Sequence, residues 1–352
     1  MSSFGFEIYP EIGGRFILDG NTTVLNYLSG GTINVEWFKE GANKYIDIAA
    51  RTPEGAQIVL IPRVNGVIRY ITGKNNGKTQ YYPAGMTNIV SCYRLDANTV
   101  RVMCESTFPS LSSLQTHYHL LYYIQNASAS GFGISFSGGE NFYSISDSTS
   151  VFPLIYKATI NFTGQFTPPI KNPEKSVSFF SWSDPDLTIT PGRELFIPGE
   201  GVTGHKLGTF YGYDRNGNAW NRSTSMRVCT FGLGDGRSPY GIDIYNAAQQ
   251  VVYNSRYGAL KNIGVISVSG PEYNYNAFPT GVDPMICPTV IGEQYQQTNS
   301  GGGGWQKILA TNMLNRKISP GYAEMQYYPP SYGGLSSISK FPIFYINAND
   351  YF

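Results

Sequence analysis

The sequence predicts an all-β protein made of three tandem β-sandwich-like domains, with little helix. Composition, periodicity and an internal repeat support this prediction. The chain of 352 residues contains 27 Tyr, 40 Gly and 21 Pro, and 14% of its residues are charged. Abundant Tyr, Thr, Ser and Gly with few helix formers are typical of turn-rich β proteins. A chain of this length is long for one core and sufficient for two or three domains.

Short runs of alternating apolar and polar residues recur along the chain. Examples are IVLIPRV from Ile58 and VIRYIT from Val67, and turn signals lie between such runs, as at 73–78 (GKNNGK) and 214–219 (DRNGNA). A period of two indicates half-buried strands. The best helix candidate, KILATNML at 307–314, is equally consistent with a strand.

The opening of the chain is repeated twice. A pentad with the pattern aromatic, Gly, apolar, polar, apolar begins at Phe4, Phe132 and Tyr240. Each pentad is followed by a turn, a second short β-run and, further on, a β-branched segment. Because order and spacing agree three times, we expect three related copies, each starting with a β-hairpin.

The repeat divides the chain into three predicted domains. Copy 1 spans residues 1–127, copy 2 spans 132–235 and copy 3 spans 240–352. Small flexible residues at 128–131 and 236–239 mark the expected linkers. Copy 2 departs most from the shared pattern, so we interpret it as degenerate. Each copy has the size of a sandwich of seven or eight short strands.

Charge and cysteine usage exclude several classes of protein. The formal net charge is +1, which argues against nucleic acid or an anionic membrane as the main partner. No apolar run approaches the ~20 residues needed to cross a bilayer, and the N-terminal residues lack signal-peptide features. We therefore expect the chain to fold where it is made. Cys92 and Cys104 flank a predicted turn and could face each other, although two buried free thiols are the simpler expectation.

Candidates for catalysis or metal binding are few. His117 and His119 are separated by one residue, so on a strand both side chains point the same way and could hold a metal. Since the sequence offers no third ligand, we expect two polar residues on one strand face. The acidic residues cannot be paired by spacing alone. We expect a protein that is not an enzyme and has no cofactor or resident metal.

Three loops of copy 3 have the composition of a recognition surface. They read PEYNYNAFPTG from Pro271, NSGGGGWQ from Asn299 and QYYPPSYGG from Gln326. Tyr and Trp give large contact areas at small entropic cost, while Gly, Ser and Asn supply adaptable polar contacts. The alternative is that these aromatics pack within the domain or line a subunit interface. The predicted receptor-binding residues are Tyr273, Tyr275, Phe278, Trp305, Tyr327, Tyr328 and Tyr332.

The opening FGFEIYPEIGGRFILD and its echo YGIDIYNAAQQVVYNSR from Tyr240 resemble the start of tail-tip and tail-fibre proteins of tailed bacteriophages. Those proteins often begin with a Gly-apolar-acidic-Ile/Val-Tyr-Asn phrase, followed by a turn and a second strand. Gly241, Asp243 and Tyr245 fit this phrase, whereas copy 1 departs from it at Pro10. The resemblance is confined to this phrase in two copies and to the length and Gly- and Tyr-rich style.

The resemblance implies a virion tail protein in a threefold or multi-copy assembly that contacts the host surface. We therefore expect a receptor-binding tail-fibre or tail-tip protein, assembled in the host cytoplasm and working as a homotrimer. Its expected partners are other phage tail proteins and a bacterial surface receptor, which is a pilus, lipopolysaccharide or protein. Copy 1 is expected to attach to the virion, and copy 3 to face the host.

Two alternatives remain open at this point. The chain could be a purely structural tail or baseplate component that never touches the receptor. It could also be a carbohydrate-degrading tail spike, although the sequence lacks the repeats of ~20–25 residues expected of a β-helix.

Overall fold

The computed structural model describes residues 5–352 with gaps. Both expected linkers, at 128–131 and 236–239, lie outside the described residues. The segments that are not described are 11, 13–15, 20–21, 37–44, 76, 107–112, 125–132, 137–142, 147–149, 193, 198–200, 234–241, 246–250, 298–303 and 329–334.

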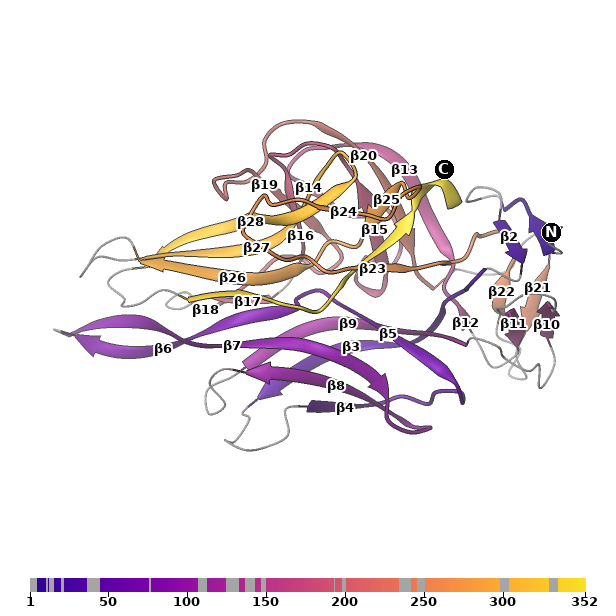
Figure 1. Ribbon diagram of the computed structural model, residues 1–352, viewed down its shortest axis with the longest axis horizontal. Helices are drawn as coiled ribbons and strands as arrows, with labels where there is room; N and C mark the ends of the chain where they lie inside the picture. Colours follow the sequence, from indigo (N-terminus) through magenta and orange to yellow (C-terminus); the bar gives the residue numbers. More distant parts are fainter. Residues whose placement is uncertain are drawn as a thin grey trace.

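Nearly all regular structure in the described part of the chain is β-strand, arranged in antiparallel sheets (Figure 1). The predicted all-β fold with little helix is therefore confirmed. The described helices are two single 3-10 turns, η2 (Pro173–Lys175) and η3 (Ala348–Asp350), and no described helix is long and apolar enough to cross a membrane. The ambiguous segment 307–314 lies within a strand.

Copy 1 forms an opening hairpin and two four-stranded sheets. The sheets have the orders β12-β3-β9-β5 and β4-β8-β7-β6, so β12 of copy 2 joins the first of them. The strands of copy 1 are β1 (Gly5–Ile8), β2 (Phe16–Asp19), β3 (Asn26–Glu36), β4 (Tyr45–Ala49), β5 (Ala56–Pro62), β6 (Gly66–Asn75), β7 (Lys78–Arg94), β8 (Thr99–Ser106) and β9 (Ser113–Ile124).

Copy 2 has the shortest strands of the three copies. They are β10 (Gly133–Phe136), β11 (Tyr143–Ser146), β12 (Ser150–Val151), β13 (Leu154–Phe162), β14 (Gln165–Phe166), β15 (Val177–Ser181), β16 (Thr188–Pro191), β17 (Glu194–Ile197), β18 (Gly201–Gly204), β19 (Phe210–Tyr213) and β20 (Thr224–Phe231).

Copy 3 contains two long strands that form its main ribbon, β27 and β28. Its strands are β21 (Asp243–Tyr245), β22 (Val251–Asn254), β23 (Gly264–Ile266), β24 (Asn276–Ala277), β25 (Pro284–Ile286), β26 (Val290–Gln297), β27 (Gly304–Leu314), β28 (Lys317–Tyr328), β29 (Leu335–Ile338) and β30 (Ile343–Asn347).

Strand pairing corrects the predicted boundary between copies 2 and 3. A six-stranded sheet, β13-β20-β15-β25-β30-β23, takes half its strands from each copy, and they meet at Phe180 opposite Ile286. An eight-stranded sheet also spans both copies, through Thr188 opposite Asn312. Copies 2 and 3 therefore share two sheets and form one sandwich-like unit.

Copy 1 also makes hydrogen bonds to both other copies. The buried guanidinium of Arg63 donates to the carbonyls of Gly192 (3.1 Å) and Glu174 (3.0 Å) in copy 2. In copy 3, the amide of Val290 donates to the Arg63 carbonyl at 2.9 Å, and the amide of Asn65 donates to the Val290 carbonyl at 2.8 Å. Buried polar groups that are satisfied across a boundary make that boundary part of the folded core.

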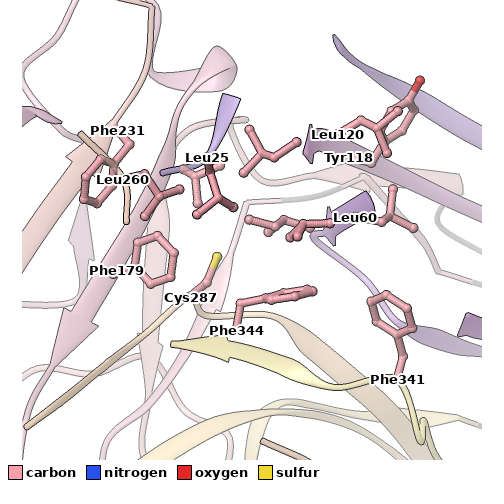
Figure 2. Packing of buried hydrophobic residues seen from close by; sticks show 14 of the residues in the cluster. Leu25, Leu60, Tyr118, Leu120, Phe179, Phe231, Leu260, Cys287, Phe341 and Phe344 are labelled. Carbon is pink, nitrogen blue, oxygen red and sulfur yellow. The ribbon is translucent and has the colours of Figure 1, made fainter. Parts of the chain in front are cut away.

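One apolar cluster runs through all three copies (Figure 2). It packs Leu60 and Leu120 of copy 1, Phe179 of copy 2, and Cys287 and Phe344 of copy 3. A contiguous core of this kind predicts that the three copies unfold together.

The three opening hairpins form as the repeat predicts. They are β1–β2, β10–β11 and β21–β22, each a separate antiparallel pair. The labels of β2, β10, β11, β21 and β22 all lie at the end of the molecule that carries the N terminus (Figure 1). The long ribbon of β26, β27 and β28 extends toward the opposite end.

The hairpin predicted between Cys92 and Cys104 forms, but the two thiols do not face each other. Cys92 lies opposite Val102, while Cys104 lies opposite Ile89, because the turn is centred on Ala97 and not on Asn98, the midpoint between the two cysteines. All four cysteines are free thiols, and burial raises the pKa of Cys92 and Cys104 to about 12.

Candidate recognition surface

The ribbon of copy 3 pairs β27 with β28, and burial alternates over the first four residues of β27. Its two long strands are joined by a two-residue turn, Asn315 and Arg316, between Leu314 and Lys317. Both turn residues have positive φ, 47° and 60°, as a type I′ hairpin turn requires. The turn therefore sets the register that brings β28 residues beside β27 residues.

Trp305 and Lys307 lie on the same face of β27, since alternate residues of a strand share a face. Trp305 is 37% exposed. The Lys307 ammonium lies 4.6 Å from the ring centroid of Tyr322 on β28, and it donates to the Gln296 side-chain oxygen at 3.1 Å. This face therefore presents an indole beside a cation that rests on a second aromatic ring.

The face continues from Tyr322 to Tyr273. Their ring centroids are 5.9 Å apart in an edge-to-face arrangement. The backbone amide of Tyr273 donates to the Pro320 carbonyl of β28 at 2.8 Å, and this hydrogen bond fixes the loop of Tyr273 against the ribbon. The φ of Tyr273 is 60°, an unusual value for a bulky residue. Such backbone strain is found more often at functional sites than elsewhere.

Arg215 extends this face with a residue from copy 2. Its guanidinium lies 4.8 Å from the ring centroid of Tyr273, and its Nε lies 2.7 Å from an Asp186 carboxylate oxygen. Arg215 is carried by a tight turn in which Asp214 accepts hydrogen bonds from the amides of Asn216 and Asn218. This confirms the prediction of a turn at 214–219.

We call Trp305, Lys307, Tyr322, Tyr273 and Arg215 the aromatic–cationic ladder. A cation over an aromatic face contributes about 0.5–1 kcal/mol at exposed sites, so each pair holds the next in place. Burial raises the pKa of Tyr273 and of Tyr322, and for Tyr322 the nearby carboxylate of Glu272 acts in the same direction. Both phenols are therefore neutral hydrogen-bonding groups at physiological pH. The ladder combines flat apolar faces, cations and hydroxyls, the chemistry that binds sugars or peptides.

The structure divides the predicted binding residues into groups. Trp305 and Tyr273 belong to the ladder. Tyr275 lies on the same loop as Tyr273 and donates to the side-chain oxygen of Asn312 at 2.7 Å. Tyr327 lies opposite Trp305 in the ribbon, and the next residue of β28, Tyr328, lies opposite Gly304. Tyr332 lies outside the described residues.

Phe278 is a correction to the predicted site. It is only 9% exposed, and its ring packs edge-to-face against Tyr345 at a centroid distance of 5.0 Å. Phe278 follows directly after β24, and its side chain fills the apolar core between the sheets of copies 2 and 3. Its loop composition suggested a surface residue, whereas its burial makes it a packing residue.

Lys307, Tyr322 and Arg215 were missed by the sequence analysis. The alternation of Trp305 and Lys307 is a usable signal, but the segment 307–314 that begins at Lys307 is equally consistent with a helix. The position of Tyr322 depends on a register shift between β27 and β28. No sequence signal connects Arg215 with copy 3, because tertiary structure alone brings the two together.

A second polar cluster ties copy 2 to copy 3. The Nε2 of His205 lies 2.9 Å from Glu324, the Tyr213 hydroxyl donates to the same Glu324 oxygen at 2.8 Å, and the imidazole stacks on Tyr211 at a centroid distance of 4.0 Å. The members of the cluster bond to one another across the boundary. This arrangement indicates a structural link.

The surroundings of His117 and His119, the candidate metal ligands of the sequence, are also described by the structure. Nδ1 of His117 lies 3.0 Å from the Thr32 hydroxyl. His119 is buried and its pKa is lowered to about 3, first by burial and then by the charges of Arg63 and His117. A guanidinium beside an imidazole opposes the binding of a metal cation. The described residues contain no cluster of three or more His, Cys, Asp or Glu that could hold a metal.

The chain belongs to the DUF6453 family, a family of unknown function, whose model matches residues 8–328. Comparison with curated proteins and with solved structures gives no match.

Proposed function

We propose that this member of the DUF6453 family is a receptor-binding component of a bacteriophage tail that carries out no catalysis. In this proposal copy 3 recognises the bacterial surface and the chain is part of the virion. The phage assignment is supported by the resemblance of the opening phrase to tail-fibre and tail-tip proteins. In copies 1 and 3, which carry the phrase, the segment forms a hairpin.

The aromatic–cationic ladder is the observation that carries the recognition role. It combines a partly exposed Trp305 with two tyrosines and two cations on one face. Trp, Tyr and Arg are the residues that most often dominate binding energy at interfaces. Trp305, Lys307 and Tyr322 lie on strands β27 and β28 of the ribbon. The ribbon extends away from the hairpin end (Figure 1), a position from which it can reach a second surface.

The test is a point substitution, because removing residues 240–352 would remove strands from two shared sheets. Trp305→Ala is expected to reduce binding of the labelled chain to intact bacterial cells about tenfold, the size of a typical interfacial hot spot. Flow cytometry on a panel of strains measures the bound fraction.

Tyr93→Ala provides the matched control. Tyr93 is 42% exposed but lies on β7 of copy 1. Its substitution is expected to leave cell binding unchanged. Equal binding by wild type and Trp305→Ala on every strain that binds the wild type would contradict the proposal, as would failure of the wild type to bind any strain.

A purely structural tail component is the second candidate. The continuous core and the hydrogen bonds of Arg63 to copy 2 favour it, because they join the copies into a rigid unit suited to a spacer. A chain that is present in virions but does not bind cells would favour this candidate. The homotrimer expected from the sequence stays a prediction, and native mass spectrometry tests it.

A further inference from the structure

Three backbone hydrogen bonds close a ring between the three copies of this chain. The backbone amide of Phe152 donates to the Leu25 carbonyl at 3.1 Å. In the same way the Leu260 amide donates to the Phe152 carbonyl at 2.8 Å, and the Leu25 amide donates to the Leu260 carbonyl at 2.9 Å. Each residue donates to one neighbour and accepts from the other. A head-to-tail contact that closes after three steps is the pattern of threefold rotational symmetry. We call these three residues the ring.

The ring residues occupy equivalent places in the three copies. The second strand of the opening hairpin ends at Asp19, Ser146 and Asn254. In each copy the ring residue is the sixth residue after that end. All three ring residues are completely buried. The ring is therefore a product of the sequence repeat.

The flanking residues repeat the same pattern. In each copy, the residue two places after the ring residue pairs through the backbone with a residue of the following copy, the one two places before its ring residue. The order runs from copy 1 to copy 2, to copy 3 and back to copy 1. Leu154 donates to the Gly258 carbonyl at 2.7 Å, and Asn262 donates to the Thr23 carbonyl at 2.8 Å. The third pair in this pattern is Tyr27 with Ser150, which lie opposite each other in the β3–β12 pair. The threefold relation therefore extends over at least five residues of each copy.

The opening hairpins lie at the end of the molecule that carries the N terminus (Figure 1), and each is followed within six residues by its ring residue. Each is a two-stranded sheet with no further strand partner among the described residues. Two-stranded hairpins are marginally stable in water unless another surface covers them, and this chain itself covers part of the β21–β22 hairpin, where Tyr253 is buried. Large apolar side chains are exposed here, Tyr9 by 77% and Ile242 by 39%.

We propose that one chain docks on a protein assembly with threefold rotational symmetry, through its three opening hairpins. One chain then supplies three equivalent hairpins, as a homotrimer would with one hairpin per subunit. Each hairpin contacts the same surface on one of three identical partner subunits. The argument rests on the ring and the hairpins and does not depend on receptor binding by the ladder.

The proposal predicts a monomer in solution, in contrast to the homotrimer expected from the sequence. Native mass spectrometry of the purified full chain is expected to show a species of 38.8 kDa. A stable homotrimer would overturn the proposal, because three chains would then present nine opening hairpins.

The partner contact is tested by photo-cross-linking in the cells that naturally produce the chain. A benzophenone amino acid replaces Tyr9 in the hairpin of copy 1 or, in a separate variant, Ile242 in that of copy 3. Both variants are expected to cross-link to the same peptide segment of the same polypeptide. Native mass spectrometry of the purified adduct is expected to give one chain to three partner subunits. Replacement of Tyr93, which is exposed on β7 of copy 1 and belongs to none of the hairpins, is the control and should not form this adduct.

Several outcomes would overturn the proposal. These are adducts to two different polypeptides, adducts between two copies of this chain, a one-to-one ratio, or no adduct from either hairpin. Circular dichroism of each variant confirms that the chain is folded. The cell-binding assay of Trp305→Ala is independent of these results, so failure of the receptor-binding proposal is recognised separately.

Discussion

The ring and the ladder show two different uses of the same repeat. At the ring the three copies place equivalent residues in equivalent positions and bond to one another in one closed pattern. At the ladder the copies differ, because copy 3 supplies a long ribbon with Trp305 and copy 2 supplies only a turn with Arg215. Repetition therefore builds the common base, while divergence builds the exposed surface.

This difference separates changes that affect stability from changes that affect binding. Residues at the ring are buried in a core that all three copies share, so their substitution is expected to destabilise the whole chain. Ladder residues are partly exposed, so their substitution is expected to change binding while the fold remains. The following predictions test that separation.

Leu260→Asp has the largest expected effect. Leu260 is completely buried, and an unpaired carboxylate at this position is expected to cost more than about 5 kcal/mol of stability. Because the core is continuous, thermal unfolding of the wild type should follow one transition, and the variant should lose structure in all three copies. Circular dichroism and limited proteolysis measure both.

Val265→Asp is the matched control, since Val265 is 57% exposed in the same copy. It should change stability by no more than about 0.5 kcal/mol. If Leu260→Asp unfolds copy 3 alone and leaves copies 1 and 2 protected from protease, the shared core is not cooperative. Leu260→Ala, expected to cost about 3 kcal/mol, provides a milder test should the Asp variant not accumulate.

Acid should destabilise the region where copies 1 and 2 meet. The pKa of His119 is about 3 in the folded protein and 6.5 in the reference state. Between these values the unfolded chain binds a proton that the folded chain does not. The stability contributed by neutral His119 is therefore complete above pH 6.5 and is lost as the pH falls toward 3. By pH 4.5 the loss is expected to be roughly 2–3 kcal/mol.

Urea unfolding at pH 7 and pH 4.5 measures this loss in the wild type and in His119→Asn. Asn does not titrate, so the variant is expected to lose less stability on acidification, whatever its stability at pH 7. Identical losses in the two proteins would mean that His119 is already protonated in the folded state at pH 4.5.

Arg215→Ala has the smallest expected effect on stability and sharpens the comparison most. Arg215 is about half exposed, so losing its contacts with Tyr273 and Asp186 should cost no more than about 1 kcal/mol. Cell binding should nevertheless fall several-fold, because the ladder loses one of its cations. Thermal unfolding and flow cytometry on the same preparation separate the two effects.

Copy 1 offers a closely matched control in Arg101→Ala. Arg101 pairs with Asp47 at 2.7 Å and lies over the Tyr45 ring at 3.6 Å, the same combination of contacts on another surface. Its substitution should change stability by a similar amount and leave cell binding unchanged. If both variants bind cells equally, Arg215 has no part in recognition.

Features that depend on neighbouring residues were predicted well from the sequence. The hairpins β1–β2, β10–β11 and β21–β22 follow from alternation and turn residues within about twenty residues. The position of Phe278 was predicted wrongly, because loop composition does not show which aromatic turns inward. Trp305 and Tyr273 were both selected, but their connection through Tyr322 was not, since it requires the register of two strands.

The sequence by itself determined the all-β fold and the three opening hairpins, because strand and turn preferences act over short distances. Only the tertiary structure decided that copies 2 and 3 share two sheets, that all three copies share one core, and that Leu25, Phe152 and Leu260 close a ring. These features join residues more than one hundred positions apart. They depend on which exposed strand edges and apolar faces find partners, and that choice is made only when the whole chain packs.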